Sequence, residues 1–155
     1  MTNGGLHTEF DDADESPGLL LWQVTNRWQA AQRAALAPFD LTHVQFVLLA
    51  ALTWLTGGSG GDPVTQRDVA DQAATDPMMT SQVLRTLEQK GLLERHDHPT
   101  DKRAKSLLPT EAGAALVNRA IGAVEGCDRE FFEPLGDQTP RFTAALRRLR
   151  DRDSD

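Results

Sequence analysis

The chain has 155 residues and a formal net charge of −7, a length that suits one domain with a core of its own. No apolar run approaches the ~20 residues that cross a bilayer, and the polar, acidic N-terminus does not resemble a signal peptide. The single cysteine, Cys127, cannot form an internal disulfide, which agrees with a reducing compartment. We therefore expect a soluble, cytoplasmic protein without a membrane partner.

The negative charge is concentrated at the two ends of the chain. Residues 1–16 carry a net charge of −5 and residues 151–155 carry −2, so the rest is neutral overall. We expect a flexible acidic arm at 1–15, a single domain at 16–150 and an acidic tail at 151–155. Residues 85–105 contain six lysines or arginines and four acids. This local excess is compatible with nucleic acid but predicts only modest nonspecific affinity.

Two helices are predicted in the first third of the chain. Ser16 and Pro17 are typical of a helix start, and this helix should end before Pro38. Its apolar face consists of Leu20, Val24, Trp28, Ala31 and Ala35. Thr42 with Gln45 forms a capping box that opens a second helix with the run VQFVLLAALTWL. Because this run is apolar on most sides, we expect the second helix to be central to the core.

The next segment predicts two helices joined by a tight turn. The connection GGSGGDP at 57–63 should be flexible, and Thr65 with Asp68 should cap a short helix. The Asp-Pro pair at 76–77 should start another helix that ends at Gly91. The predicted buried stripe of this helix consists of Val83, Leu84 and Leu87. Its predicted exposed polar face consists of Ser81, Gln82 and Arg85.

A β-hairpin with a basic tip follows. The segments 92–96 and 104–108 can pair as antiparallel strands, and Thr110 should cap a new helix after them. The connecting loop contains His98, Pro99, Asp101, Lys102 and Arg103. Two helices followed by such a hairpin constitute a winged helix-turn-helix, which we place at 41–110. The predicted fold class is therefore mainly α with a small β-hairpin wing.

The last part of the chain predicts two further helices, from Glu111 to about Glu133 and from about Pro140. Together with the first helix, they present more apolar surface than one winged unit can cover. We therefore expect 16–37 and 111–150 to form a two-fold dimer, with recognition helices about 34–36 Å apart. The apolar residues expected at this interface are Leu20, Val24, Ile121, Val124, Phe131, Phe142, Leu146 and Leu149.

This order of elements resembles the multiple antibiotic resistance regulator (MarR) family of bacterial transcription factors. LTHVQFVLLAAL at 41–52 is similar to the family's Leu-Thr-x-x-Gln helix start, and TQRDVADQ at 65–72 to its first helix-turn-helix element. LEQKGLLER at 87–95 is similar to the end of its recognition helix, and DKRAKSLLPTEAG at 101–113 to its wing and the following cap. The resemblance covers about residues 17–150.

The resemblance implies roles for the wing. Arg103 matches the arginine that enters the minor groove, where narrow width and negative potential favour a guanidinium. Asp101 matches the acid that pairs with and orients that arginine. Arg95 would reach phosphate or the same acid, and Lys102 lies beside them at the basic tip.

The resemblance also implies roles for the two helices. Ser81, Gln82 and Arg85 fall where the family's recognition helix meets base edges, because glutamine can bond adenine and arginine guanine. The residues expected to touch phosphates or to pack on DNA are Thr65, Gln66 and Met78. The family often has arginine where Gln82 stands, so its base preference does not carry over to this chain.

The family often binds small aromatic anions, which suggests an effector site. Trp22, Trp28, His43, Phe46 and Trp54 could line a crevice between the dimer helices and the winged unit. The alternative is that these residues are simply part of the core.

Other chemistry has weaker support. His96, Asp97 and His98 offer metal ligands, but no fourth ligand is evident. Cys127 has acidic neighbours and fits an inert thiol better than a redox sensor. No base and nucleophile pair is evident, and GGSGG lacks the Lys-Ser/Thr of a phosphate-binding loop. We expect no cofactor, no metal and no enzyme activity.

We interpret the chain as a homodimeric repressor that occupies a palindromic operator in double-stranded DNA. A small aromatic effector would release it by changing the separation of the recognition helices. The alternatives are a winged helix used for protein contacts and a redox- or metal-responsive regulator.

Overall fold

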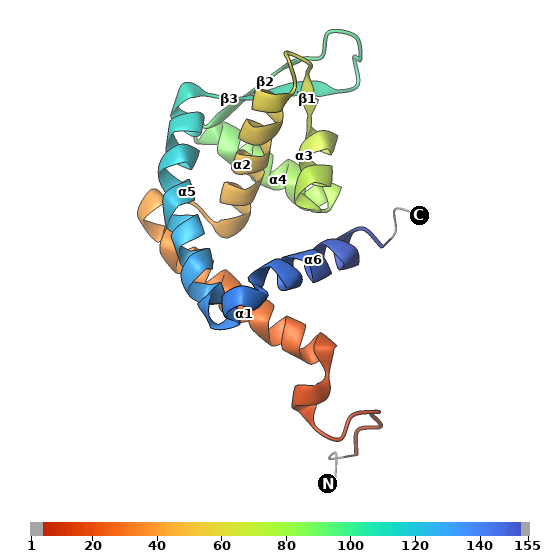
Figure 1. Ribbon diagram of the computed structural model, residues 1–155. Coiled ribbons are helices and arrows are strands. Elements are labelled where there is room, and N and C mark those ends of the chain that lie inside the picture. The colour runs from red at the N-terminus through yellow and green to blue at the C-terminus, as the bar shows by residue number, and fades with distance from the viewer. Residues whose placement is uncertain (1–4, 153–155) are drawn as a thin grey trace.

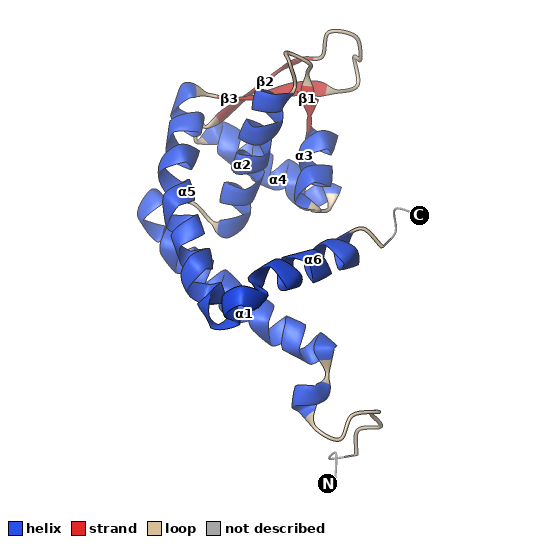
Figure 2. Ribbon diagram, viewed as in Figure 1, coloured by secondary structure: helices blue, strands red, loops and turns tan. Residues whose placement is uncertain are grey.

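The computed structural model describes residues 5–152, which form a mainly helical chain with a small sheet at one end (Figures 1 and 2). The predicted fold class is confirmed. In chain order the elements are η1 Ala13–Glu15, α1 Pro17–Leu36, η2 Ala37–Phe39, α2 His43–Gly58, β1 Val64–Thr65, α3 Gln66–Ala73, α4 Pro77–Gln89, β2 Leu93–Asp97, β3 Lys105–Pro109, α5 Glu111–Phe132, η3 Glu133–Gln138 and α6 Thr139–Arg150.

The helices begin at the residues whose side chains can satisfy the free N–H groups of a first turn. Asp76 accepts from the backbone N–H of Met79 at 2.8 Å, and Thr110 accepts from that of Gly113 at 3.0 Å. Full capping boxes are present at the starts of α2 and α3, and Ser16 caps α1. Each such cap stabilises its helix by roughly 1 kcal/mol. The predicted helix starts are therefore confirmed.

The core is built around α2, as predicted. Leu48, Leu49 and Leu52 of this helix are completely buried. They belong to one cluster with Leu84 and Leu87 of α4 and with apolar residues of β3 and α5. α2 also contacts α1, α3 and β1, whereas β2 joins the winged unit through β3 and α4.

One detail of the predicted α4 stripe differs from the structure. Thr80 is completely buried, whereas Val83 is only partly buried. The hydroxyl of Thr80 bonds to the hydroxyl of Thr75 at 2.6 Å and to the carbonyl oxygen of Asp76 at 2.8 Å. These bonds satisfy its polar atom in the interior and hold α4 against the turn from α3.

The sheet has three antiparallel strands in the order β1-β3-β2. The hairpin of β2 and β3 is confirmed, with Arg95 opposite Leu107. The strand β1 was not predicted: Val64 also pairs with Leu107 and is buried. Gly57 and Gly58 belong to α2, so the predicted flexible connection at 57–63 is wrong at its start. Glycine weakens a helix by about 1 kcal/mol but does not stop it.

The N-terminal segment contains more structure than expected. Asp12 and Glu15 form a capping box around the single 3-10 turn at 13–15, where no element was predicted. Residues 1–4 of the predicted arm and 153–155 of the predicted tail lie outside the described residues. No described helix is by itself long and apolar enough to cross a membrane. The helical segments 17–39 and 43–58 meet the length and apolar composition of a span only when they are taken together, and they are bent by 74° relative to each other.

The first half of α1 and the whole of α6 project from the body of the molecule (Figure 1). In α6 no residue is buried, and Phe142 packs on Phe132 at a ring distance of 5.7 Å. The residues expected at a dimer interface differ in exposure within one chain. Leu20, Val24, Leu146 and Leu149 are exposed; Ile121, Phe131 and Phe142 are partly buried. Val124, by contrast, lies in the chain's own core and is not available on its surface.

Candidate nucleic-acid interface

The polar face of α4 is exposed because the opposite face is held in the core by Leu84 and Leu87. Gln82 and Arg85 are exposed and Ser81 is half-buried. The Arg85 guanidinium donates to the Ser81 hydroxyl at 3.4 Å, so the two side chains lie side by side. This face presents donors and acceptors that can bond base edges.

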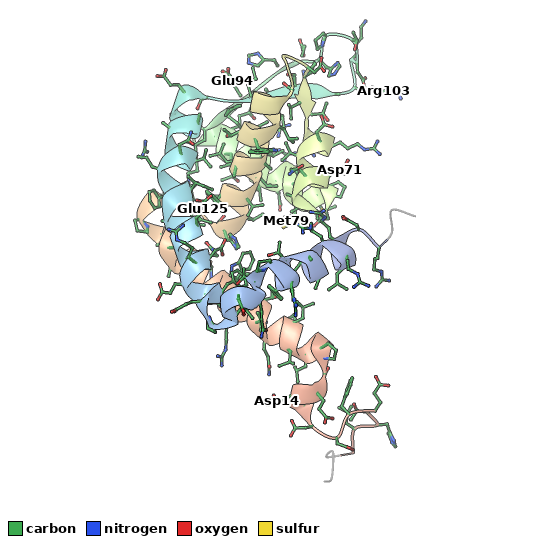
Figure 3. The ribbon with its side chains drawn as sticks, in the orientation of Figure 1. Asp14, Asp71, Met79, Glu94, Arg103 and Glu125 are labelled. Atoms are coloured by element: carbon green, nitrogen blue, oxygen red, sulfur yellow. The ribbon has the colours of Figure 1, made fainter. Side chains whose placement is uncertain are left out.

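The first turn of α4 carries an exposed apolar side chain. Met78 is 79% exposed. Met79, labelled in Figure 3, is also exposed, at 37%. Apolar side chains at a recognition helix can contact the methyl group of thymine.

A cleft of about 820 Å³ lies between α3, the start of α4 and the wing. Its charged lining residues are Arg67, Arg95, Arg103, Lys105, Asp71 and Asp101. The basic side chains outnumber the acidic ones, which favours an anionic ligand such as the phosphate backbone. Thr65 and Gln66 also line it, whereas Met78, Ser81, Gln82, Arg85 and Lys102 do not.

Two lining residues, Thr65 and Arg67, differ in how free they are to contact DNA. The Thr65 hydroxyl lies 3.0 Å from Asp68 Oδ2 and accepts from the Asp68 N–H, so the helix cap uses it. Arg67, in the first turn of α3, is an exposed cation that the sequence analysis missed. Its one available signal was a basic residue directly after the Thr-Gln helix start.

The tip of the wing is organised by hydrogen bonds within the loop. His98 Nδ1 accepts from the backbone N–H groups of Thr100, at 3.2 Å, and Asp101, at 3.0 Å. Asp101 in turn accepts from the backbone N–H of Arg103 at 2.9 Å. The carboxylate therefore bonds the main chain of Arg103, and no ion pair with its guanidinium is present among the described residues. Arg103 lies exposed at the outer end of the loop (Figure 3).

Arg95 joins the wing to α4. Its Nε lies 3.4 Å from Glu88 Oε1, and its side chain is 24% exposed. The geometry is an ion pair without a hydrogen bond, because Nε and Nη2 are enclosed with no hydrogen-bond partner among the described residues. The predicted contact with Asp101 is not made. Arg95 instead lines the cleft.

The two histidines of the wing, His96 and His98, have different partners. His96 lies 3.3 Å from Glu94, and the ion pair between Lys105 and Asp97 lowers the pKa of that carboxyl group. His98 uses Nδ1 within the loop. Among the described residues, no group of three His, Cys, Asp or Glu side chains has an arrangement suited to a metal ion.

The five residues predicted to line one aromatic crevice do not do so. Trp28 and His43 form an edge-to-face pair at 4.9 Å between α1 and α2. Phe46 and Trp54 line a different cavity of about 820 Å³ between α2, α3 and α5. Trp22 is 69% exposed on the projecting half of α1. The prediction of a single crevice is therefore wrong.

Helix α5 contributes a carboxylate that ties α1 to it. Asp128 Oδ1 accepts from the Trp28 indole N–H and from Gln32 Nε2, both at 2.7 Å. Burial lowers the pKa of the nearby His43, while the negative charge of Asp128 partly opposes this effect. Burial, followed by the charges of Asp128 and Glu130, raises the pKa of the Cys127 thiol. This disfavours the reactive thiolate that redox sensing requires.

Comparison with known proteins agrees with this geometry. The MarR family model matches residues 41–105. The HTH-type transcriptional regulator YdcH of Bacillus subtilis is 47% identical over 126 residues, which are 81% of this chain and 84% of that protein. The HTH-type transcriptional repressor Rv2887 of Mycobacterium tuberculosis is 30% identical over 88% of this chain and 96% of its own length.

A solved structure extends the likeness to three dimensions. The structure of Bordetella bronchiseptica BpsR has a TM-score of 0.74 with this chain at 27% sequence identity. That structure is described with the regulation of BpsR DNA binding by 6-hydroxynicotinic acid. The alignment covers 93% of this chain and 96% of that one. The chain therefore belongs to the MarR family and is a winged-helix transcriptional regulator.

Proposed function

We propose that the chain is a homodimeric, non-enzymatic repressor in the cytoplasm that binds a palindromic operator in double-stranded DNA. The observation that carries the proposal is the basic cleft, which brings Arg95, Arg103 and Lys105 of the wing beside the start of α3. A wing and a helix-turn-helix arranged around one positive surface fit the backbone and grooves of a duplex.

In this proposal, α4 enters the major groove and reads sequence. Gln82 bonds adenine, Arg85 bonds guanine with Ser81 beside it, and Met78 packs on a thymine methyl group. Gln66 and Arg67 at the start of α3 contact phosphates, which position the protein but carry no sequence information. Lys102 adds charge at the wing tip, and Arg103 inserts into the minor groove.

The dimer assigned here uses the two projecting parts of the chain. Leu20 and Val24 on α1 and Leu146 and Leu149 on α6 are exposed at between 38% and 62%. Burying such residues against a second copy removes apolar surface from water at about 25 cal/mol per Å². We assign 16–37 and 111–150 to dimerisation and 41–110 to DNA binding.

An effector would act through the cavity between the winged unit and α5. Phe46, Trp54 and Ile121 supply apolar surface there, and Gln72 and Asn118 supply polar groups. This composition suits a small aromatic molecule with one or two polar substituents. The control of BpsR by 6-hydroxynicotinic acid supports this class of ligand. A ligand in the cavity would change the angle between α3 and α5 and so the recognition-helix separation.

The decisive experiment is a gel shift with the native promoter. Arg103→Ala removes the guanidinium that we place in the minor groove. Because losing one specific contact costs roughly 1–3 kcal/mol, we expect operator affinity to fall about 10-fold or more. Lys102→Ala is the matched control, since it removes one neighbouring positive charge and should have a smaller effect. Unchanged affinity of the Arg103→Ala protein would contradict the proposed wing contact and favour a winged helix used for protein contacts.

A further inference from the structure

We propose that, in the dimer, the acidic segment 9–15 of one copy lies against the arginine-rich helix α6 of the other copy. The contact is a charge clasp between chains, made twice because of the two-fold axis. It rests on the homodimer proposed above and specifies which residues the second copy supplies.

Helix α6 carries positive charge that residues 5–152 leave largely without ion pairs. Residues 139–150 contain four arginines and no acid. Arg150 pairs with Asp151 at 2.7 Å, whereas Arg141 and Arg148 form no ion pair with any residue of 5–152. Arg141 and Arg148 are seven positions apart, so they lie on the same side of the helix.

The N-terminal segment carries the complementary charge. Residues 9–15 contain five acids, and the first lysine or arginine of the chain is Arg27. Asp12 and Glu15 bond the backbone of the 3-10 turn, which fixes the segment to the start of α1. The remaining acids, Glu9, Asp11 and Asp14, are exposed and form no ion pair among the described residues.

Both charged segments adjoin apolar surface that the chain leaves uncovered. Trp22 is 69% exposed just beyond the acidic segment, and Leu149 is 62% exposed among the arginines of α6. Figure 1 shows the start of α1 and α6 leaving the body in different directions, and Figure 3 places Asp14 away from α6. A partner that covers the apolar surface of α6 while carrying negative charge has the chemistry of segment 9–24 of a second copy.

Net charge gives a physical reason for such a contact. Each copy carries −7, so two copies repel each other at long range. Opposite charges placed locally at the interface offset this repulsion and also fix the relative orientation of the two chains. The apolar residues then supply most of the free energy of association, and the charges determine which surfaces meet.

The test is a charge-reversal cycle followed by sedimentation equilibrium of the full chain. We expect Arg141→Glu with Arg148→Glu to raise the dimer dissociation constant about 10-fold at low salt, since exposed pairs each contribute a few tenths to 1 kcal/mol. Glu9→Lys, Asp11→Lys and Asp14→Lys together should weaken the dimer similarly. Because combining the two sets recreates opposite charges, it should restore most of the affinity. The single-set defects should shrink at roughly 1 M salt, where the Debye length is about 3 Å.

The matched control is Lys102→Glu with Arg103→Glu, which changes net charge equally but lies on the wing. It should leave dimerisation almost unchanged. A dissociation constant that charge reversal on α6 does not alter, or a combined variant without recovery, would overturn the clasp while leaving the dimer intact. Loss of DNA affinity by the α6 variant at unchanged dimer stability would assign the arginines to phosphate and also overturn it. A monomeric wild-type chain would overturn the proposed dimer itself.

A second measurement does not depend on destabilising variants. Arg141→Lys with Arg148→Lys keeps the charge and adds amines that a zero-length carbodiimide reagent can join to carboxylates. Mixing isotope-labelled and unlabelled protein separates links between chains from links within one. We expect links between position 141 or 148 and segment 9–15 across chains. Links only within one chain would contradict the clasp.

Discussion

His43 lies at the junction of α1, α2 and α5, where its surroundings favour the neutral imidazole. Burial lowers its pKa, Arg33 acts in the same direction, and Asp128 opposes them. The unfolded chain, with a histidine pKa near 6.5, therefore takes up the proton first as the pH falls. The stability that neutral His43 provides is present above about pH 6.5 and decreases below it, until the folded protein is protonated as well.

We expect His43→Gln to reduce this pH dependence. The measurement is urea unfolding of both proteins at about pH 7.5 and about pH 5.5. The wild type should lose up to about 1 kcal/mol more than the variant over this interval, a small value because the imidazole is partly exposed to solvent. The other three histidines are common to both proteins and cancel in the comparison. An equal pH response of the two proteins would show that His43 does not carry the effect.

The wing shows which residues the sequence could single out and which contacts it could not predict. The family resemblance indicated Arg103 and Asp101 by their position in the wing segment, but the structure has Asp101 bonding the main chain of Arg103, where an ion pair with its guanidinium was expected. It did not indicate His98, whose ring nitrogen accepts two backbone N–H groups of the same loop. That role depends on the loop conformation, and a histidine in a turn carries no local signal for it. The partner of Arg95 was missed for a similar reason, because Glu88 approaches it only through the packing of α4 on the wing.

At the level of elements, the start of α5 is fixed to the hairpin by a close backbone contact. Gly113 lies against the Leu92 carbonyl group, which also accepts from the Thr110 N–H at 3.1 Å. A Cβ at position 113 would overlap that carbonyl oxygen, and neither backbone can move without breaking the cap. The glycine is required here by close approach of two backbones, since its own conformation is helical.

We therefore expect Gly113→Ala to destabilise the protein by about 1–3 kcal/mol, as overpacking typically does. Gly122→Ala in the same helix is the control. Its Cβ would meet no atom within 4 Å, so it should be neutral or stabilise by up to about 1 kcal/mol through helix propensity. Denaturant unfolding of the three proteins measures both effects. Equal stability of the two variants would contradict the steric explanation.

The elements that could be predicted are those whose signals are local. Thr42, Asp76 and Thr110 each cap a helix within their own first turn, so the sequence alone locates these starts. The strand β1 has only two residues and exists because Val64 pairs with Leu107, far away in the chain. Two residues contain no periodicity, so nothing in the sequence distinguishes this strand from the loop before it.

At the scale of the whole molecule, the aromatic residues show what a single sequence does not determine. Trp28 and Phe46 could have shared one crevice, but Trp28 pairs with His43 where α1, α2 and α5 meet, whereas Phe46 lines the cavity between α2, α3 and α5. Helical periodicity places each residue on a face of its own helix. Which faces then meet depends on crossing angles, which the periodicity leaves open.

The two-fold dimer gives a prediction about the spacing of DNA half-sites. If α1, α5 and α6 hold two winged units rigidly, both recognition helices contact the duplex only when the half-sites lie on one face and about 10–10.5 base pairs apart. Inserting about five base pairs at the operator centre rotates one half-site to the opposite face, and we expect affinity to fall about 100-fold towards that of a single half-site.

Operators with central base pairs exchanged at constant length are the control for this measurement and should bind much more tightly than the lengthened one in gel shifts. An insertion of about ten base pairs returns the half-sites to one face but moves them about 34 Å further apart. A rigid dimer cannot span this distance, so binding should stay weak. Recovery with the longer insertion would mean that the two winged units are joined flexibly, whereas unaltered binding at both lengths would mean that one chain recognises one site.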